Sequence, residues 1–184
     1  MMISKYIKLA LICFACISAL AYLACERDDL CPDSTQTTAS LIITAFDASN
    51  LEDRKNIADL RIIGVNNDKV LEGFNIVTED SLVLPLRTDA DVTQYVLHQN
   101  YAENDNATPD NPDDDFIEGN ADTITVRYVR NEIYVSRACG FKTLFTNVSV
   151  VREDDGDNWI SFLRAENANQ TIEDEAQAHF KLFH

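Results

Sequence analysis

Short stretches rich in β-branched and aromatic residues recur along the chain, with polar turn signals between them. Such stretches are typical of β-strands, and no long stretch has the 3.6-residue period of an amphipathic helix. The predicted strands are residues 39–47, 60–65, 70–71, 81–86, 92–99, 122–130, 133–136, 141–151, 159–163 and 179–183. The pattern predicts an all-β fold, a two-sheet antiparallel β-sandwich of immunoglobulin-like or transthyretin-like type with about nine short strands.

Polar residues and prolines indicate where these strands end. Asn131 is predicted to turn the chain, and residues 153–158 are predicted to form a hairpin turn. Pro85 favours an edge position or a bulge, because proline cannot donate a ladder hydrogen bond. Residues 103–118 contain seven carboxylates together with Pro109 and Pro112, which predicts an acidic loop.

The first 25 residues have the pattern of an export signal. Lys5 and Lys8 precede an apolar run from Leu9 to Ala24, and Cys25 follows. This run is shorter than the ~20 residues of a spanning helix and suits the core of a cleaved signal. The interpretation is a lipoprotein signal peptide (residues 1–24), a lipidated tether (25–38) and one sandwich domain (39–184). An uncleaved membrane helix and ordinary signal-peptidase cleavage are the alternatives.

Charge narrows the range of partners. The formal charge is −16, and a mature chain starting at Cys25 has 13 basic and 31 acidic residues, hence −18. Such a surface repels nucleic-acid phosphates, so nucleic acid is excluded as a partner. High acidity also serves plain solubility.

Of the five cysteines, Cys13 and Cys16 lie in the predicted signal peptide and Cys25 is the candidate lipidation site. Cys31 and Cys139 remain. In an exported domain two remaining cysteines most simply pair as a disulfide. Two free thiols are the alternative, and a metal site is disfavoured because no histidine lies near either residue in sequence.

Catalytic chemistry is not indicated. The three histidines do not fall in a motif with a nucleophile, and the sequence contains neither a Gly-x-Ser-x-Gly elbow nor a glycine-rich phosphate loop. We therefore expect a protein that is not an enzyme and needs no cofactor. The acidic loop offers weak calcium-ligand candidates in Asp110, Asp113, Asp114 and Asp115, although it lacks the Asp-x-Asp-x-Asp-Gly order and a solvated loop is the simpler interpretation.

Eight aromatic residues fall at strand spacing, and core packing is their default interpretation. They are Tyr128, Tyr134, Phe141, Phe145, Trp159, Phe162, Phe180 and Phe183. Exposure of several of them on one face would instead favour a glycan-binding platform.

Three segments together carry a resemblance: the Cys25–Cys31 spacing, the strand containing Leu84, Pro85 and Leu86, and residues 135–141 around Ala-Cys-Gly-Phe. In these the chain resembles an uncharacterised family of Bacteroidetes lipoproteins. The resemblance implies an envelope location and a Cys31–Cys139 pair, but no activity. Ser34, Ser81 and Thr123 fit the loose Asp-Ser/Thr pattern of O-glycosylation in exported proteins of that group, although Ser81 and Thr123 also suit strand starts.

The sequence thus predicts an outer-membrane protein held by lipid and facing either the periplasm or the medium. Its expected role is that of a non-catalytic interaction or accessory protein, with the membrane and a protein or glycan as partners. A glycan- or calcium-binding module is the first alternative, and a hydrolase is the second.

Overall fold

The computed structural model describes residues 30–184 except 167 and 169, so the predicted signal peptide and Cys25 lie outside the described residues. The chain divides into two compact units. One comprises residues 30–35, as far as it is described, with Tyr134–Phe141, and is called the capped hairpin below. The other, the sandwich, comprises Gln36–Ile133 and Lys142–His184. None of the described residues belongs to a helix that could cross a bilayer.

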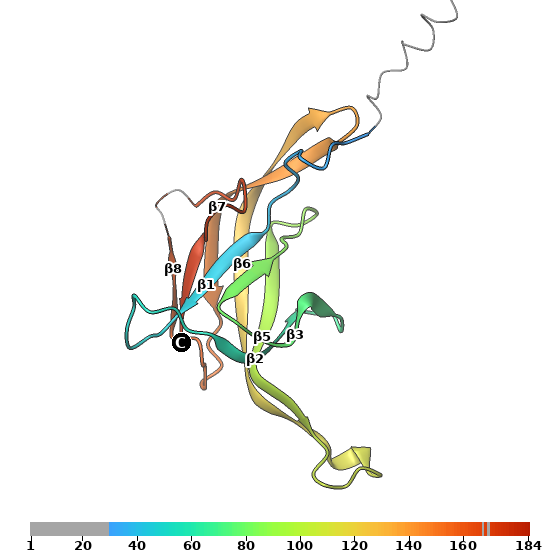
Figure 1. Ribbon diagram of the computed structural model, residues 1–184, viewed down its shortest axis with the longest axis vertical. Coiled ribbons are helices and arrows are strands. Elements are labelled where there is room, and N and C mark those ends of the chain that lie inside the picture. Colours follow the sequence, from blue (N-terminus) through green and yellow to red (C-terminus); the bar gives the residue numbers. More distant parts are fainter. Residues whose placement is uncertain (1–29, 167, 169) are drawn as a thin grey trace, which may run out of the picture. The chain divides into compact units, whose positions relative to one another are not determined.

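Nine strands and one short 3-10 helix make up the described secondary structure (Figure 1). The strands are β1 (Leu41–Phe46), β2 (Ile57–Gly64), β3 (Val70–Glu79), β4 (Ser81–Leu84), β5 (Val92–Asn104), β6 (Phe116–Ser136), β7 (Gly140–Arg152), β8 (Phe162–Ala165) and β9 (Phe180–Phe183), with η1 at Pro112–Asp114. They form a four-stranded sheet of order β4-β1-β9-β8 and a five-stranded sheet of order β3-β2-β5-β6-β7. The predicted all-β, two-sheet sandwich is confirmed.

The core lies between the two sheets, because both contribute to one cluster of buried apolar side chains. Leu41 and Ile43 of β1 come from the four-stranded sheet, and Ile62, Leu97 and Ile124 come from the other; all five are fully buried. Along the first part of β5, from Val92 to His98, buried positions alternate with partly buried ones, as expected of a strand with one face in the core. Each such side chain contributes about 1.5–3 kcal/mol relative to exposure.

The predicted turn at Asn131 is wrong. β6 runs without a break through Asn131 to Ser136, and the chain turns at residues 137–139. Asn131 instead donates its side-chain amide to the hydroxyl of Thr146 on β7 over 3.0 Å. An asparagine that finds a cross-strand partner can stay in a strand, so its turn preference is overridden by pairing.

The hairpin turn that the sequence predicts at residues 153–158 is also wrong. β7 belongs to the five-stranded sheet and β8 to the four-stranded one, so the connection crosses from one sheet to the other. Buried Asp122 holds the crossing segment: its carboxylate accepts the backbone N–H groups of Trp159 (3.3 Å) and Ile160 (2.8 Å). Burial raises the pKa of Asp122.

The two sheets are antiparallel except at one pair of the described strands. β9 pairs parallel to β1, with Ile43 opposite Phe180 and Phe46 opposite Phe183. The other side of β9 pairs antiparallel with β8. The last strand of the chain is therefore a central strand, and the four-stranded sheet depends on it.

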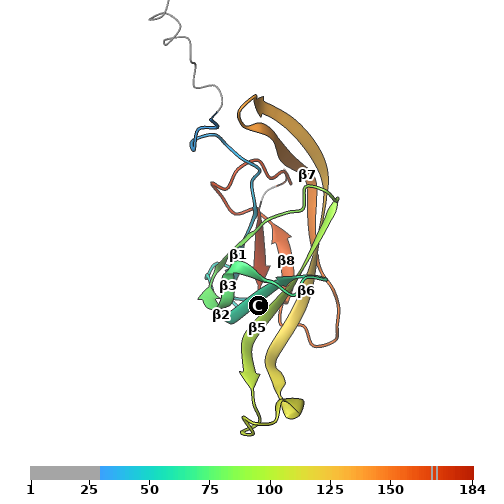
Figure 2. The ribbon, with the colours of Figure 1, turned by 90° about the vertical axis from the view of Figure 1, so that its right-hand side faces the viewer.

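The acidic loop is narrower than residues 103–118. β5 continues to Asn104 and β6 begins at Phe116, with these two residues opposite each other in the ladder. The loop is confined to residues 105–115 and includes η1. In both ribbon views the β5–β6 hairpin extends beyond the neighbouring strands of the sandwich (Figures 1 and 2).

A bulge interrupts the long β5–β6 ladder between Gln99 and Ala102. Gly119 of β6 lies against it with a positive φ of +97°. A Cβ atom there would collide with the backbone carbonyl oxygens of Gln99 and Asn100. Glycine is thus required both by its backbone conformation and by the close approach of the two strands.

We expect Gly119→Ala to lower the free energy of unfolding by about 3 kcal/mol, from backbone strain and steric overlap together. Gly73→Ala is the matched control, because Gly73 also has a positive φ (+83°) but nothing lies within 4 Å of its missing Cβ. It should cost only about 1–2 kcal/mol. Urea unfolding of both variants measures the difference; equal losses would contradict the close approach.

Histidine burial couples the fold to pH. The Nδ1 atom of His179 accepts the backbone N–H of Ile42 over 2.9 Å, which requires an unprotonated nitrogen. Burial lowers the pKa of His179, and the same cause lowers the pKa of His98 and His184. Below the ordinary histidine pKa of about 6.5 the unfolded chain therefore takes up protons first, and the folded state loses stability.

The free energy of unfolding should therefore decrease as the pH falls from 7 through the lowered folded-state pKa values of the histidines. His179→Asn can keep an acceptor near the Nδ1 position but cannot titrate. Its pH slope between 7 and 5 should be shallower than that of the parent by at most about 1.4 kcal/mol per pH unit. Denaturant unfolding across this range tests this, and parallel slopes would argue against a role for His179.

Candidate functional site

A disulfide defines the capped hairpin. Cys31 and Cys139 have an S–S distance of 2.06 Å and a Cα–Cα distance of 4.8 Å, although 108 residues separate them in sequence. This is the pair that remained after the other cysteines were assigned. The bond joins the segment that follows the predicted anchor to the turn between β6 and β7.

Local hydrogen bonds shape both halves of the capped hairpin. The backbone N–H of Cys139 donates to the hydroxyl of Ser136 over 3.0 Å, which closes the turn. Gly140 begins β7 with a positive φ of +71°, the conformation that glycine adopts at least cost. On the other segment the N–H of Thr35 donates to the carbonyl of Pro32 over 2.9 Å.

The capped hairpin exposes large apolar side chains. Leu30 is 74%, Tyr134 58% and Phe141 66% exposed. The rings of Tyr134 and Phe141 meet edge to face, with centroids 5.4 Å apart. Exposed single apolar residues are common, but here two aromatic rings are exposed together beside the turn that the disulfide links to the Cys31 segment.

Charge distinguishes the two units. Among the described residues the capped hairpin contains one acidic and one basic side chain, Asp33 and Arg137, so its formal charge is zero. The sandwich contains 27 acidic and 11 basic residues, and its formal charge is −16. The exposed aromatic pair thus belongs to the one unit that is electrically neutral.

The eight aromatic residues of the sequence reading divide between core and surface. Tyr128, Phe145, Phe180 and Phe183 are buried, Trp159 is partly buried, and Tyr134, Phe141 and Phe162 are exposed. Phe162 stacks on Phe183 with ring centroids 4.4 Å apart. Core packing therefore accounts for most of the set, and the Tyr134–Phe141 pair is exposed together.

The candidate calcium ligands lie on the exposed acidic loop. Asp113 and Asp114 belong to η1, with Asp110 and Asp115 on either side of it. Asp114 accepts the hydroxyl of Thr108 at 2.8 Å, and this hydrogen bond is the main cause of its lowered pKa. Across the described chain, no three metal-ligating side chains are grouped closely enough to hold an ion.

The three glycosylation candidates differ in accessibility. Ser34 is exposed in a turn of the capped hairpin. Ser81 is partly buried at the start of β4, opposite Thr44 of β1. Thr123 is partly buried within β6, opposite Val96 of β5. Of the three, only Ser34 presents a hydroxyl outside a strand ladder.

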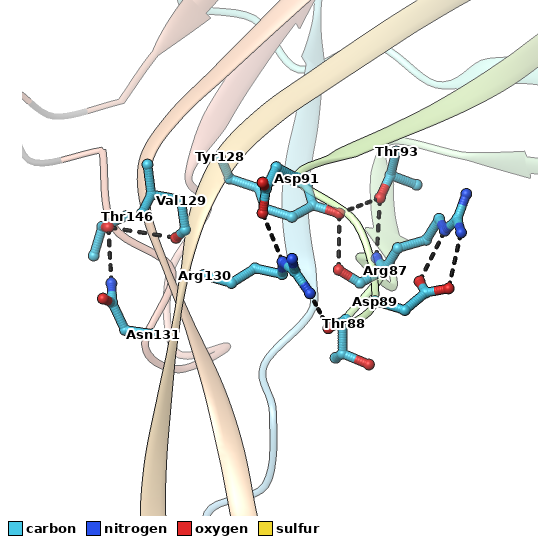
Figure 3. A network of polar contacts seen from close by, with 10 residues as sticks. All are labelled: Arg87, Thr88, Asp89, Asp91, Thr93, Tyr128, Val129, Arg130, Asn131 and Thr146. Atoms are coloured by element: carbon cyan, nitrogen blue, oxygen red, sulfur yellow. Dashed lines mark hydrogen bonds and ion pairs between the residues drawn. The ribbon is translucent and has the colours of Figure 1, made fainter.

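A polar network fixes the segment before β5 (Figure 3). The hydroxyl oxygen of Thr93 accepts the backbone N–H of Arg87 over 3.0 Å and lies 2.6 Å from the hydroxyl of Tyr128. The Tyr128 hydroxyl donates to the carbonyl of Arg87 over 2.9 Å, so the Thr93 hydroxyl donates to Tyr128. Thr93 and Tyr128 thus hold the backbone N–H and the carbonyl of Arg87. Burial raises the pKa of Tyr128.

Ion pairs extend this network on the surface. Arg87 pairs with Asp89 over 2.8 Å, and this contact is the main cause of the lowered pKa of Asp89. Arg130 pairs with Asp91 over 2.6 Å and donates to the carbonyl of Thr88. Exposed ion pairs contribute little to stability; these pairs hold the path of residues 87–91.

Arg87 also lines a cleft of about 570 Å³ in the sandwich. The β2–β3 turn contributes Asn66 and Lys69, and the start of β5 contributes Gln94 and Tyr95. Burial raises the pKa of Tyr95 to about 12, and its hydroxyl donates to the carbonyl of Pro85. Amide and cationic groups around such a volume suit a polar ligand. Sequence reading missed this cleft, because no motif links segments that only the sheet brings together.

A comparison with models of protein families matches this chain. A family of unknown function, DUF6452, matches residues 59–184. Neither the curated proteins nor the solved structures include a significant match.

Removing the disulfide should destabilise the protein without changing its surface charge. For Cys31→Ser with Cys139→Ser we expect a loss of about 4–5 kcal/mol, because opening a loop of this length restores entropy to the unfolded chain. Urea unfolding with and without a reductant measures it. Reduced wild type should behave like the double variant; a wild-type midpoint that does not respond to reductant would contradict the pairing.

Proposed function

We propose that this chain, which belongs to DUF6452, a family of unknown function, is a non-catalytic interaction protein of the bacterial outer membrane, anchored by lipid on Cys25. The mature protein would start at Cys25 and reach the sandwich through a short tether. The sandwich would then be the part that meets a protein or glycan partner, in the periplasm or at the cell surface.

The Cys31–Cys139 disulfide carries this proposal. Disulfides persist in oxidising compartments and are rare in the bacterial cytosol, so a bonded pair supports export. The pair includes the cysteine that follows the candidate lipidation site by six positions. The apolar run from Leu9 to Ala24 behind two lysines supplies the route of export.

The charge of the sandwich bears on the choice of partner. A formal charge of −16 on one unit favours basic or neutral partners and disfavours nucleic acid. It also keeps an anchored domain away from anionic headgroups, which leaves its surface available to a partner.

A glycan-binding module is the second candidate, and the cleft favours it. Asn66, Lys69 and Gln94 place amide and ammonium groups around about 570 Å³, and Glu72 adds a carboxylate; this set of donors and acceptors suits the hydroxyl groups of envelope sugars. A glycan array probed with the native protein tests this candidate. Binding that is lost in Lys69→Ala would favour it over a protein partner.

Acylation is tested by Cys25→Ser. We expect this variant to leave the detergent phase and to appear as a soluble or unprocessed form, because the acyl chains on Cys25 would supply the membrane attachment. Cys13→Ser is the matched control: it changes a cysteine of the predicted signal peptide and should leave detergent partitioning and mature mass unchanged. A Cys25→Ser protein that partitions like the parent would refute the lipid anchor.

A further inference from the structure

The disulfide limits how far the capped hairpin can lie from the candidate anchor. Cys25 and Cys31 are six residues apart, and an extended chain spans at most about 3.6 Å per residue. The Cys31 sulfur is bonded to Cys139 at the β6–β7 turn. Whatever path residues 25–30 take, that turn therefore stays within about 20–30 Å of the acylated residue, which is less than the full thickness of a bilayer.

The surface that the disulfide keeps near the candidate anchor is apolar and aromatic. Leu30, Tyr134 and Phe141 are the large apolar side chains that the described part of the capped hairpin exposes. Leucine, phenylalanine and tyrosine are the residue types that favour the membrane–water interface, where a ring can lie at the level of the headgroups. The edge-to-face contact of Tyr134 and Phe141 keeps the two rings together.

Formal charge also favours the capped hairpin over the sandwich as the unit that contacts a membrane. The sandwich has a formal charge of −16, whereas the described part of the capped hairpin is neutral. Residues 26–29 of the same unit add a net charge of −2 (Glu26, Arg27, Asp28, Asp29), so an anionic membrane surface still repels the sandwich far more strongly than this unit. Arg137 is exposed in the turn itself, where a guanidinium can donate to a lipid phosphate.

From reach, side-chain type and charge we propose that the capped hairpin is a second membrane contact, with Leu30, Tyr134 and Phe141 inserted at the lipid interface. This inference rests on the lipid anchor proposed above and adds to it. The acyl chains hold the protein at the membrane, and the capped hairpin sets which end of β6 and β7 faces the bilayer. A second copy of the chain or a protein partner on this surface is the competing outcome.

Tryptophan quenching tests the proposal on the acylated, full mature chain. Phe141→Trp and, as an independent second probe, Tyr134→Trp are reconstituted in vesicles of phosphatidylethanolamine and phosphatidylglycerol, with or without brominated acyl chains. The parent protein, measured alongside, supplies the signal of Trp159 for subtraction. The matched control is Val83→Trp, an exposed apolar position (40%) on β4 of the sandwich.

The added tryptophan at 141 or 134 should shift its emission to the blue on vesicles and be quenched by brominated lipid at least about threefold more than the one at 83. Equal quenching at the hairpin and control positions would overturn the proposal. So would a blue shift without bromine quenching, since that indicates cover by protein instead of lipid.

The same samples separate this inference from the anchor on which it rests. One outcome is that the protein floats with the vesicles and its intact mass includes fatty acid, but the hairpin tryptophans are not quenched. This outcome would support the lipid anchor and refute the membrane contact. An intact mass without fatty acid and no flotation would refute both. Far-ultraviolet circular dichroism of each variant must match the parent, and with two hairpin probes a folding defect in one variant leaves the other to decide.

Discussion

The four-stranded sheet exists only because the end of the chain is inserted into it. β9 lies between β1 and β8, parallel to one and antiparallel to the other. Phe180, Leu182 and Phe183 of this strand are all buried, so the strand completes a hydrogen-bonded ladder and these three residues complete one side of the core. Without β9, β1 would keep only β4 as a paired strand, and the two sheets would lose part of their shared interior.

Buried polar groups then fix connections that the apolar core leaves undetermined. Asp122 holds the segment that crosses between the sheets, and the Thr93–Tyr128 pair holds the backbone of Arg87. Among the described residues no buried side-chain nitrogen or oxygen lacks a hydrogen-bond partner. Because an unpaired buried polar group costs about 1–3 kcal/mol, each of these contacts selects one path for its loop.

The two units differ in formal charge and in the side chains they expose. The sandwich concentrates the acidic residues and carries a cleft lined by polar side chains. The capped hairpin is neutral, apolar and closed by the disulfide.

The sequence by itself determined the fold class, because alternating apolar residues with frequent turn signals can bury their faces only as paired sheets. It also singled out Cys31 and Cys139 by elimination, and the structure brings these two residues together. Pairing between distant segments decided the rest. Asn131 stays in β6 because Thr146 lies opposite, the β7–β8 connection changes sheets because Asp122 receives it, and the cleft forms where the β2–β3 turn meets β5. Such outcomes depend on which strands become neighbours, and local composition does not predict which strands pair.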